Sequence, residues 1–378
     1  MPEVTLKKIS YGQLFDNSWQ SDDDRYGIAS FVDANVRQTF LKNPSNIDAS
    51  KTALLLVVDN GVVVGRSLLY GTKIKRVDDV IDAQSFGSIE VHESQRGKGL
   101  GTKIANYSLG NDEYPVFLCS LLSDACDSIM RKADCTLFYY SETIRVINTE
   151  SAFACRGLKG LPLKICSGLG NLFLEVVNIP IKTRIRRLKK KYCLKRENDI
   201  PEWAGDMCMN DGHKYAELHD NEWLEWNLKY NLTNKPQDKQ SFYSIYKGDM
   251  PVGFIFTKER LRDDVTNEMI IGTLCEWASV DAELTETDIN LLAFDTFDQR
   301  CYYVRTVSDN PETVEKLRKF GFVRHGKCKW VSKTSLVNIL IWLNGPIGVF
   351  VLVAVILFYT NRFLLLRLQI IKRIQIIN

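Results

Sequence analysis

The stretch from Ser88 to Tyr107 constrains the fold more than any other, because its pattern predicts a strand that runs through a glycine-rich turn into a helix. The turn contains Gly97, Gly99 and Gly101. Glycine lets a backbone approach a ligand closely, and the first N–H groups of a helix have no partner within the helix. Such donors bind anions, so the turn predicts a site for a phosphate or pyrophosphate.

The glycine spacing excludes two common phosphate-binding motifs. It is not the Gly-x-Gly-x-x-Gly of a dinucleotide site, and no Gly-Lys-Ser/Thr ends the run as in a P-loop. It does match Arg/Gln-x-x-Gly-x-Gly/Ala, from Arg96 to Gly101. With this loop and the preceding strand Ile89–His92, the chain resembles the GCN5-related N-acetyltransferases, whose loop binds the pyrophosphate of acetyl-CoA between the fourth strand and the next helix. The alternative is a chance glycine turn.

The resemblance implies an α/β (α+β) fold, with a mixed β-sheet flanked by helices, and direct transfer of an acyl group to an amine. Acetyl-CoA or another acyl-CoA would be the co-substrate, and no metal is expected. The residues that the resemblance assigns to acyl-CoA binding are Val91, Arg96, Gly97, Lys98, Gly99, Leu100, Gly101 and Thr102.

Attack of an amine on a thioester needs a proton acceptor near the amine and a donor for the departing thiolate. Glu90 is the first choice for the acceptor, with His92 and Glu93 behind it. His92 has a suitable ordinary pKa, but a histidine at that strand position can also simply pack. Glu90 and His92 are therefore the predicted catalytic residues.

The proton donor stays unassigned. Members of the family often use a tyrosine in the late helix, four residues before a Gly-Phe pair. That place holds Leu317 in the second half of the chain, and Met130 or Arg131 is the nearest equivalent in the first half. The missing tyrosine departs from the family's pattern and puts a standard catalytic mechanism in doubt. The cysteines show no pairing with a histidine, so no covalent acyl-enzyme is indicated.

Residues 1–150 follow the element order that the resemblance implies. Strands are predicted at Val4–Ile9, in a hairpin over 53–58 and 62–70 with an Asp-Asn-Gly turn, at 116–122 and at 136–147. Helices are predicted over 26–40 and, capped by Ser123, over 124–132.

Residues 200–333 repeat parts of this pattern. Val64-Gly65 recurs as Val252-Gly253 in a second hairpin, and Ser123-Asp124 recurs as Ser308-Asp309 at nearly the same offset. An internal duplication explains both, so we predict two tandem acetyltransferase-like domains, each with its own mixed sheet. The second copy has four carboxylates and no glycine in the segment 281–288. These would repel a pyrophosphate, so the second copy is predicted to shape an acceptor cleft or a domain interface, or to be purely structural.

Two segments predict contact with a membrane. Residues 151–199 form a basic amphipathic linker: 157–180 are apolar, and 181–196 hold nine basic residues and no acid. They resemble a surface for anionic lipid, although most charge runs are solvated. Residues 334–378 contain 24 uncharged residues from Leu336 to Tyr359, followed by a basic tail. A membrane-spanning helix is predicted there, with an interfacial hairpin and burial in an oligomer left as alternatives.

Composition narrows the classes further. With 49 basic and 46 acidic residues, nothing points to nucleic acid. The ten cysteines include no Cys-x-x-Cys pair, which argues against a zinc site. The start of the chain has no apolar stretch typical of a secretory signal. Trp223 and Trp226 suit either a sugar-binding cleft or a helix core.

Together these patterns predict a membrane-attached acyl-CoA-dependent N-acyltransferase whose residues 1–333 face the cytoplasm, where acetyl-CoA is supplied. The acceptor predicted is an amine, in the narrowest form an amino sugar of a lipid-linked glycan precursor, since an anchored enzyme gains effective concentration on an anchored substrate. The alternative is a non-catalytic, membrane-attached protein that uses the old CoA cleft to bind a partner or ligand.

Overall fold

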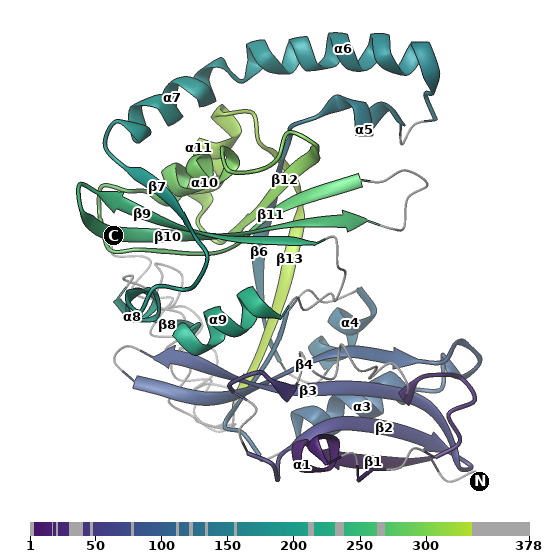
Figure 1. Ribbon diagram of the computed structural model, residues 1–378. Coiled ribbons are helices and arrows are strands. Elements are labelled where there is room, and N and C mark those ends of the chain that lie inside the picture. The colour runs from purple at the N-terminus through teal and green to yellow at the C-terminus, as the bar shows by residue number, and fades with distance from the viewer. Residues whose placement is uncertain are drawn as a thin grey trace, which may run out of the picture. The chain divides into compact units, whose positions relative to one another are not determined.

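The computed structural model of the protein is shown in Figure 1. It describes residues 4–334 except 17, 20–21, 30–40, 46–47, 77–78, 111–112, 121–123, 133–134, 155–156, 211–214, 231–237 and 263–268. Residues Met1–Lys333 form one compact unit, separate from Thr334–Asn378. The predicted membrane helix over 336–359 and most of the predicted helix over 26–40 lie outside the described residues, and 26–29 form turns.

The first half follows the predicted order closely. The hairpin of β2 and β3 turns at Asn60 and Gly61, whose φ angles of 50° and 78° explain the choice of residues at the turn. Strand β3 is longer than predicted, because its far end pairs with β4 along the whole hairpin. The elements are β1 (Val4–Ser10), α1 (Tyr11–Phe15), β2 (Thr52–Asp59), β3 (Val62–Arg76), β4 (Asp79–Val91), α3 (Leu100–Leu109), β5 (Val116–Ser120), α4 (Asp124–Lys132) and β6 (Thr136–Val146).

The predicted linker over 151–199 is largely helical. It contains α5 (Thr149–Ala154), α6 (Gly160–Val177) and α7 (Ile179–Lys189), and it ends in β7 (Cys193–Glu197). The rest of the second half consists of α8 (Trp203–Asn210), β8 (Tyr215–Glu217), α9 (Asn221–Lys229), β9 (Lys239–Lys247), β10 (Met250–Arg262), β11 (Met269–Ser279), α10 (Glu286–Phe294), β12 (Cys301–Ser308), α11 (Pro311–Lys319) and β13 (Val323–Thr334).

The two mixed halves join into one 13-stranded sheet, in the order β1-β2-β3-β4-β5-β13-β6-β12-β11-β10-β9-β7, with β8 paired to β3. Strand β6 lies between β13 and β12, where Ile144 is opposite both Val323 and Arg305. The last strand of each half therefore also completes the sheet of the other half. The domain boundaries drawn from the sequence stay a prediction, since hydrogen bonds cross between the halves within one compact unit.

The strand order of the second half repeats that of the first. Strands β1 to β4 pair antiparallel and β5 joins β4 in parallel. Strands β7, β9, β10 and β11 likewise pair antiparallel, and β12 joins β11 in parallel. A parallel pair needs a crossover, which is α3 in the first half and α10 in the second.

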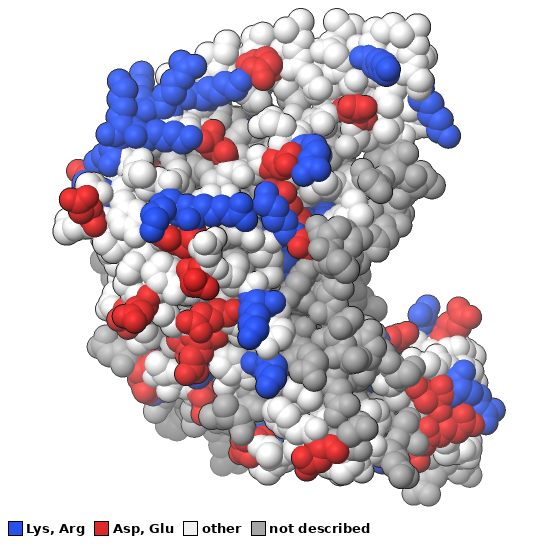
Figure 2. All heavy atoms as spheres, viewed as in Figure 1, with Lys and Arg blue, Asp and Glu red and all other residues white. Residues whose placement is uncertain are grey.

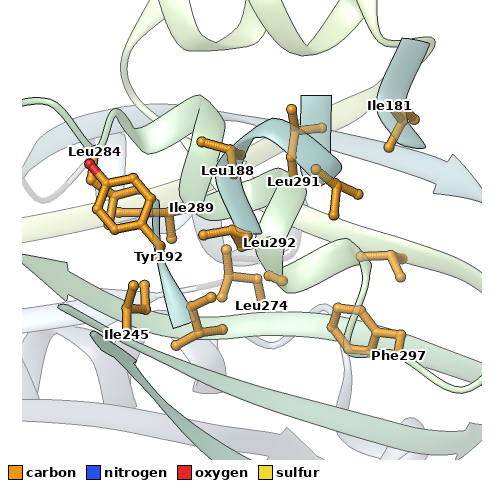
Figure 3. Packing of buried hydrophobic residues seen from close by; sticks show 14 of the residues in the cluster. Ile181, Leu188, Tyr192, Ile245, Leu274, Leu284, Ile289, Leu291, Leu292 and Phe297 are labelled. Carbon is orange, nitrogen blue, oxygen red and sulfur yellow. The ribbon is translucent and has the colours of Figure 1, made fainter. Parts of the chain in front are cut away.

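Apolar layers cover both faces of each half. In the first half, α1 covers one face, while α3 and α4 cover the other. In the second half, α8 and α9 pack on one face, while α7 and α10 pack on the opposite one (Figure 3). Helix α7 is anchored there by three buried side chains, Ile181, Ile185 and Leu188.

Candidate functional site

The predicted anion-binding turn links β4 to α3 through a short 3-10 turn, Glu93–Gln95. Gly97 and Gly99 have φ angles of 82° and 76°, a region that favours glycine over any residue with a side chain. Gly99 is the N-cap of α3 and supplies no side-chain cap to the helix. The glycines are therefore required by the backbone conformation of the turn, before any ligand is considered.

The backbone N–H groups of this turn have no hydrogen-bond acceptor within the described part of the chain. Among the described residues, no acceptor is hydrogen-bonded to the amides from Gly97 to Thr102. A Cβ added at Gly97 or Gly99 would meet no atom within 4 Å, so the space beside the turn is open. These features fit a bound pyrophosphate. Gly101 differs from our expectation, because a Cβ there would make an ordinary contact of 3.6 Å with Ile129, so the protein itself does not demand glycine at that position.

Side chains around the turn add positive charge and rigidity. Exposed Arg96 donates through Nε to the carbonyl of Val91 at 3.3 Å, and exposed Lys98 donates to Gln95 at 2.6 Å. Leu100 is buried against the core beneath α3, so the first turn of the helix is fixed. Both cations lie beside the free amides, where they would strengthen binding of a polyphosphate.

Strands β4 and β5 separate next to this turn. Their pairing ends at Ser85 and Leu118, and β4 continues from Phe86 to Val91 without a partner on β5 among the described residues. The pairing of β4 with β3 is also irregular between Arg66 and Leu68, which marks a β-bulge. This separation, a fork between β4 and β5, gives a ligand that extends from the turn access to backbone groups of β4.

Glu90 lies on the α1 face of β4, opposite Arg66 of β3. Its Oε2 is 2.6 Å from a guanidinium nitrogen of Arg66, and its side chain is 49% exposed. Arg66 is buried and also donates to the carbonyl of Ile28. Burial lowers the pKa of Arg66, while Glu90 acts in the opposite direction. Glu90 is thus held in place by a fixed cation and still reachable from solvent.

His92 follows Glu90 on the same face. Its ring stacks on Tyr26, with centroids 3.8 Å apart, and its Nδ1 lies 2.8 Å from the hydroxyl of Ser94. These contacts agree with the packing role that the sequence also allowed for this histidine. Glu93 lies beyond the strand end, where its carbonyl accepts from the amide of Arg96. Glu90 and His92 therefore share one face at the end of β4 but have different partners, and Glu93 is exposed at the turn.

A tyrosine that the sequence reasoning missed contacts Arg131, one of the two residues nearest to the place expected for the proton donor. Met130 and Leu317 are fully buried and carry no proton to give. Arg131 forms an ion pair with Asp127 at 3.0 Å and also donates to the hydroxyl of Tyr139 on β6. Tyr139 is exposed. The only signal in the sequence is a tyrosine soon after α4, and the contact with Arg131 is visible in the fold alone.

The corresponding loop of the second half is closed by its own side chains. Asp281, directly after β11, accepts from the hydroxyl of Tyr192 and from Lys247, both at 3.0 Å. Lys247 also pairs with Glu283 at 2.8 Å. Burial opposes ionisation of Asp281, but the Glu283 amide and Lys247 outweigh it and lower its pKa. Asp281 and Glu283, two of the four predicted carboxylates, are thus neutralised by lysines of the same half.

The start of α10 is also capped internally. Thr285 is its N-cap and accepts from the amide of Asp288 at 3.2 Å. Asp288 is buried and forms two hydrogen bonds of 2.9 Å with Arg184 of α7. Side chains therefore occupy the positions that a phosphate would need, which agrees with the prediction that this copy binds acyl-CoA poorly.

The tryptophans considered for a sugar-binding cleft make packing contacts within the second half. Trp226 is buried in the helix core, and Trp223 stacks on His219 with centroids 3.5 Å apart. Burial opposes protonation of His219, but Glu276 outweighs it and raises its pKa. No group of metal-binding residues is found in the described part of the chain.

A buried lysine on β10 was not singled out from the sequence. Lys258 is 2% exposed and has no hydrogen bond or ion pair among the described residues. Burial, and then the neighbouring Arg260, lower its pKa to about 8. Lys258 lies opposite Thr273 on β11, which in turn lies opposite Arg305 on β12. Lys258 therefore lies beside the point at which β11 stops pairing with β12.

No family model and no curated protein matches the sequence. Solved structures do match its fold. One is a GCN5-related N-acetyltransferase from Anabaena variabilis ATCC 29413, with a TM-score of 0.52 and 10% identity over 85% of this chain and 74% of that chain. Another is a conserved protein of unknown function from Enterococcus faecalis V583, a probable N-acyltransferase, with a TM-score of 0.52 and 11% identity over 91% of this chain and 74% of that chain.

The chain thus has a mixed α/β fold in which a strand, an open glycine turn and a helix form a candidate anion site. Its fold is similar to that of the GCN5-related N-acetyltransferase from Anabaena variabilis, in agreement with the fold expected from the sequence motif.

Proposed function

We propose that this protein is an acyl-CoA-dependent N-acyltransferase, with acetyl as the transferred group and the first half as the catalytic part. The observation behind the proposal is the turn before α3, whose free amides and two positive-φ glycines border open space. Acyl-CoA supplies a thioester carbonyl when bound. Its pyrophosphate would be held by the amides from Gly99 to Thr102, with Arg96 and Lys98 beside it.

Glu90 is proposed as the general base. It lies on the strand that enters the turn, and Arg66 fixes one of its oxygens. An amine that arrives as an ammonium ion must lose a proton before it attacks, and a carboxylate reachable from solvent can take that proton directly or through one water. Arg66 is a positioning residue in this scheme, because it acts through Glu90.

Tyr139 is proposed as the donor to the departing thiolate. The hydrogen bond from Arg131 places a cation beside the oxygen that would carry the negative charge after transfer. We expect Tyr139→Phe to slow thiol release about 10²- to 10⁴-fold, in the range of a lost general acid, with CoA affinity unchanged. An unchanged rate in steady-state assays would remove Tyr139 from the mechanism.

The narrower proposal for the acceptor is an amino sugar of a lipid-linked glycan precursor, with the protein attached to the membrane through residues 336–359 and residues 1–333 in the cytoplasm. The uncharged run of 24 residues in the tail supports the attachment. Truncation after Lys333 should then move the protein from the membrane fraction to the soluble fraction in folded form. Soluble full-length protein, together with aggregation of the truncated form, would contradict the anchor.

The test of the activity is release of free thiol from acetyl-CoA by the full chain, with a panel of amines that includes amino sugars, polyamines and peptide amines. We expect release above the hydrolysis rate with at least one amine and a product heavier by one acetyl group. CoA binding without turnover on any amine would favour the non-catalytic alternative. Absence of CoA binding would reject both the activity and the use of this turn as a CoA site.

A further inference from the structure

Helix α6 exposes a continuous stripe of large apolar side chains to solvent. The helix is 18 residues long and has a mean hydropathy of 1.3, but only 6% of it is buried. The exposed fractions of the stripe range from 54% to 69%. Positions three and four apart lie on the same side of a helix, so these residues share one face. They are Leu161, Ile165, Leu169, Leu172, Phe173 and Val176.

The opposite side of α6 is fixed to the protein. Thr149 at the start of α5 donates through its hydroxyl to the side chain of Asn171 at 2.8 Å and to the carbonyl of Ser167 at 3.1 Å. A Cβ on Gly170 would lie 2.7 Å from that same hydroxyl, so the two helices approach closely there. This packing sets the rotation of α6 and turns its apolar stripe away from the protein.

Helix α7 continues directly from α6 and adds positive charge. Its apolar side is buried in the core of the second half (Figure 3). Three of its cations pair with carboxylates: Lys182 with Glu175, Arg184 with Asp288 and Lys189 with Asp295. Figure 2 shows a cluster of basic side chains at the upper left, over α7, beside the mostly uncharged top edge formed by α6.

Three further cations at this end of α7 have no such partner. Arg186, Arg187 and Lys190 form no ion pair within the described part of the chain. A surface with unpaired cations next to an apolar stripe attracts an anionic, apolar layer. A bilayer with acidic lipids is both anionic and apolar, because its charged headgroups lie directly above the acyl chains.

We propose that α6 and α7 form a membrane-docking surface, with α6 lying in the plane of an anionic bilayer and its stripe among the acyl chains. Arg186, Arg187 and Lys190 contact the acidic headgroups at one end. This docking is independent of the tail over 336–359 and of the proposed transferase activity, because it follows from the exposure and charge of the two helices alone.

Two other arrangements of α6 explain the observations less well. A helix of 18 residues is about 27 Å long, which is barely enough to span a bilayer core. Spanning would also require α6 to leave α5 and give up the bonds of Thr149. Contact with a second copy would cover the stripe, but α6 and α7 offer no free carboxylate to meet the three cations, since their one acid, Glu175, is already paired.

A photo-crosslinking experiment on the full chain tests the occupant of the stripe directly. Phe173→p-benzoylphenylalanine is placed in the protein, which is mixed with phosphatidylcholine–phosphatidylglycerol vesicles that contain an alkyne-tagged lipid. We expect a lipid adduct on ultraviolet irradiation. Phe15, 45% exposed on α1, serves as the matched control with the same substitution and should give no lipid adduct. Because the readout is local, a tail anchored in the same vesicles does not produce the signal.

The other outcomes overturn the proposal. A crosslinked dimer from position 173 would identify a second copy as the occupant, and equal lipid adducts at 173 and 15 would mean non-specific contact. No adduct at position 173 would show that the stripe does not meet lipid.

A charge variant tests the basic part of the surface. Arg186→Gln combined with Arg187→Gln and Lys190→Gln should reduce the lipid adduct at position 173 at least tenfold on acidic vesicles, because each cation near an anionic surface contributes several-fold to binding. The protein that keeps Arg186, Arg187 and Lys190 should show a similar reduction of the lipid adduct on vesicles of phosphatidylcholine alone. An adduct yield that stays the same in the charge variant and on vesicles of phosphatidylcholine alone would contradict the role of α7. An unchanged melting temperature of the variant is the control for folding.

Discussion

The two strand–loop–helix units, β4–α3 and β11–α10, have the same place in the sheet and opposite properties. In the first, two glycines at positive φ leave the amides free and the surrounding space open. In the second, Asp281 and Glu283 bind Lys247, and Thr285 caps the helix. The fold therefore contains this strand–loop–helix unit twice, and a few loop residues decide whether the start of the helix stays open or is closed by side chains of the protein.

The difference also separates the features that both halves keep from those that differ between their loops. The backbone course needed for a parallel pair of strands is kept in both halves, because β5 and β12 each require a crossover helix. Charge and side-chain volume in the loop are free to change without loss of that course. A carboxylate that pairs with lysines of its own half stabilises the loop and excludes a phosphate at the same time.

The largest effect is expected from Gly99→Val. A valine at a φ of 76° is strained, and its branches fill the space through which the backbone would reach a pyrophosphate. CoA binding measured by calorimetry should fall below detection. Ala282→Val, an exposed change in the second loop, is the control and should leave binding unchanged. If Gly99→Val binds CoA like the parent, the assignment of the turn is wrong.

Glu90→Gln tests the base with almost no change in volume. Turnover should fall about 10²- to 10⁴-fold, the usual range for a general base, while CoA affinity is kept. Glu276→Gln on β11 removes a carboxylate from the second half and should leave the rate nearly unchanged. Equal rates for Glu90→Gln and the parent would move the role to His92, Glu93 or a water.

Lys258→Met tests the cation that the second half buries without a partner. Since its pKa is lowered to about 8 from 10.5, burial of the charge costs stability in full below pH 8. That cost fades as the pH rises through 8 and is gone above the unfolded value of 10.5. The variant should gain about 3 kcal/mol in the free energy of unfolding at pH 7 and almost nothing at pH 10.5. Urea unfolding at both pH values measures this, and equal gains would contradict it.

The smallest effect is expected from Asp281→Asn. The lowered pKa of Asp281 means that its carboxylate stabilises the folded state above its unfolded pKa near 4, and that this stability is lost as the pH falls through the folded value. The variant should lose about 1 kcal/mol at pH 7, in line with a partly exposed ion pair, and progressively less as the pH falls below 4. It should also gain no CoA binding, because Thr285 still caps α10. A variant that binds CoA would show that charge alone closes the second loop.

The sequence by itself determined the local parts of this protein. The Asp-Asn-Gly and Gly-x-Gly turns could be read directly, because only residues that accept positive φ suit those conformations. Poor acyl-CoA binding by the second loop is also a prediction from the sequence, since four carboxylates without glycine would repel a pyrophosphate. In the two turns the interactions lie within a few residues along the chain, whereas the contacts of Asp281 in the second loop come from Lys247 and Tyr192, 34 and 89 residues away.

The tertiary structure alone decided the remaining features, because they depend on contacts between residues far apart in the sequence. Strand β13 enters the sheet between β5 and β6, and no local pattern specifies that position. Arg66 fixes Glu90, Arg131 contacts Tyr139, and the bonds of Thr149 turn the apolar side of α6 outward. Periodicity shows that a helix has an apolar face, but the packing of the opposite face decides whether that face meets the core or the solvent.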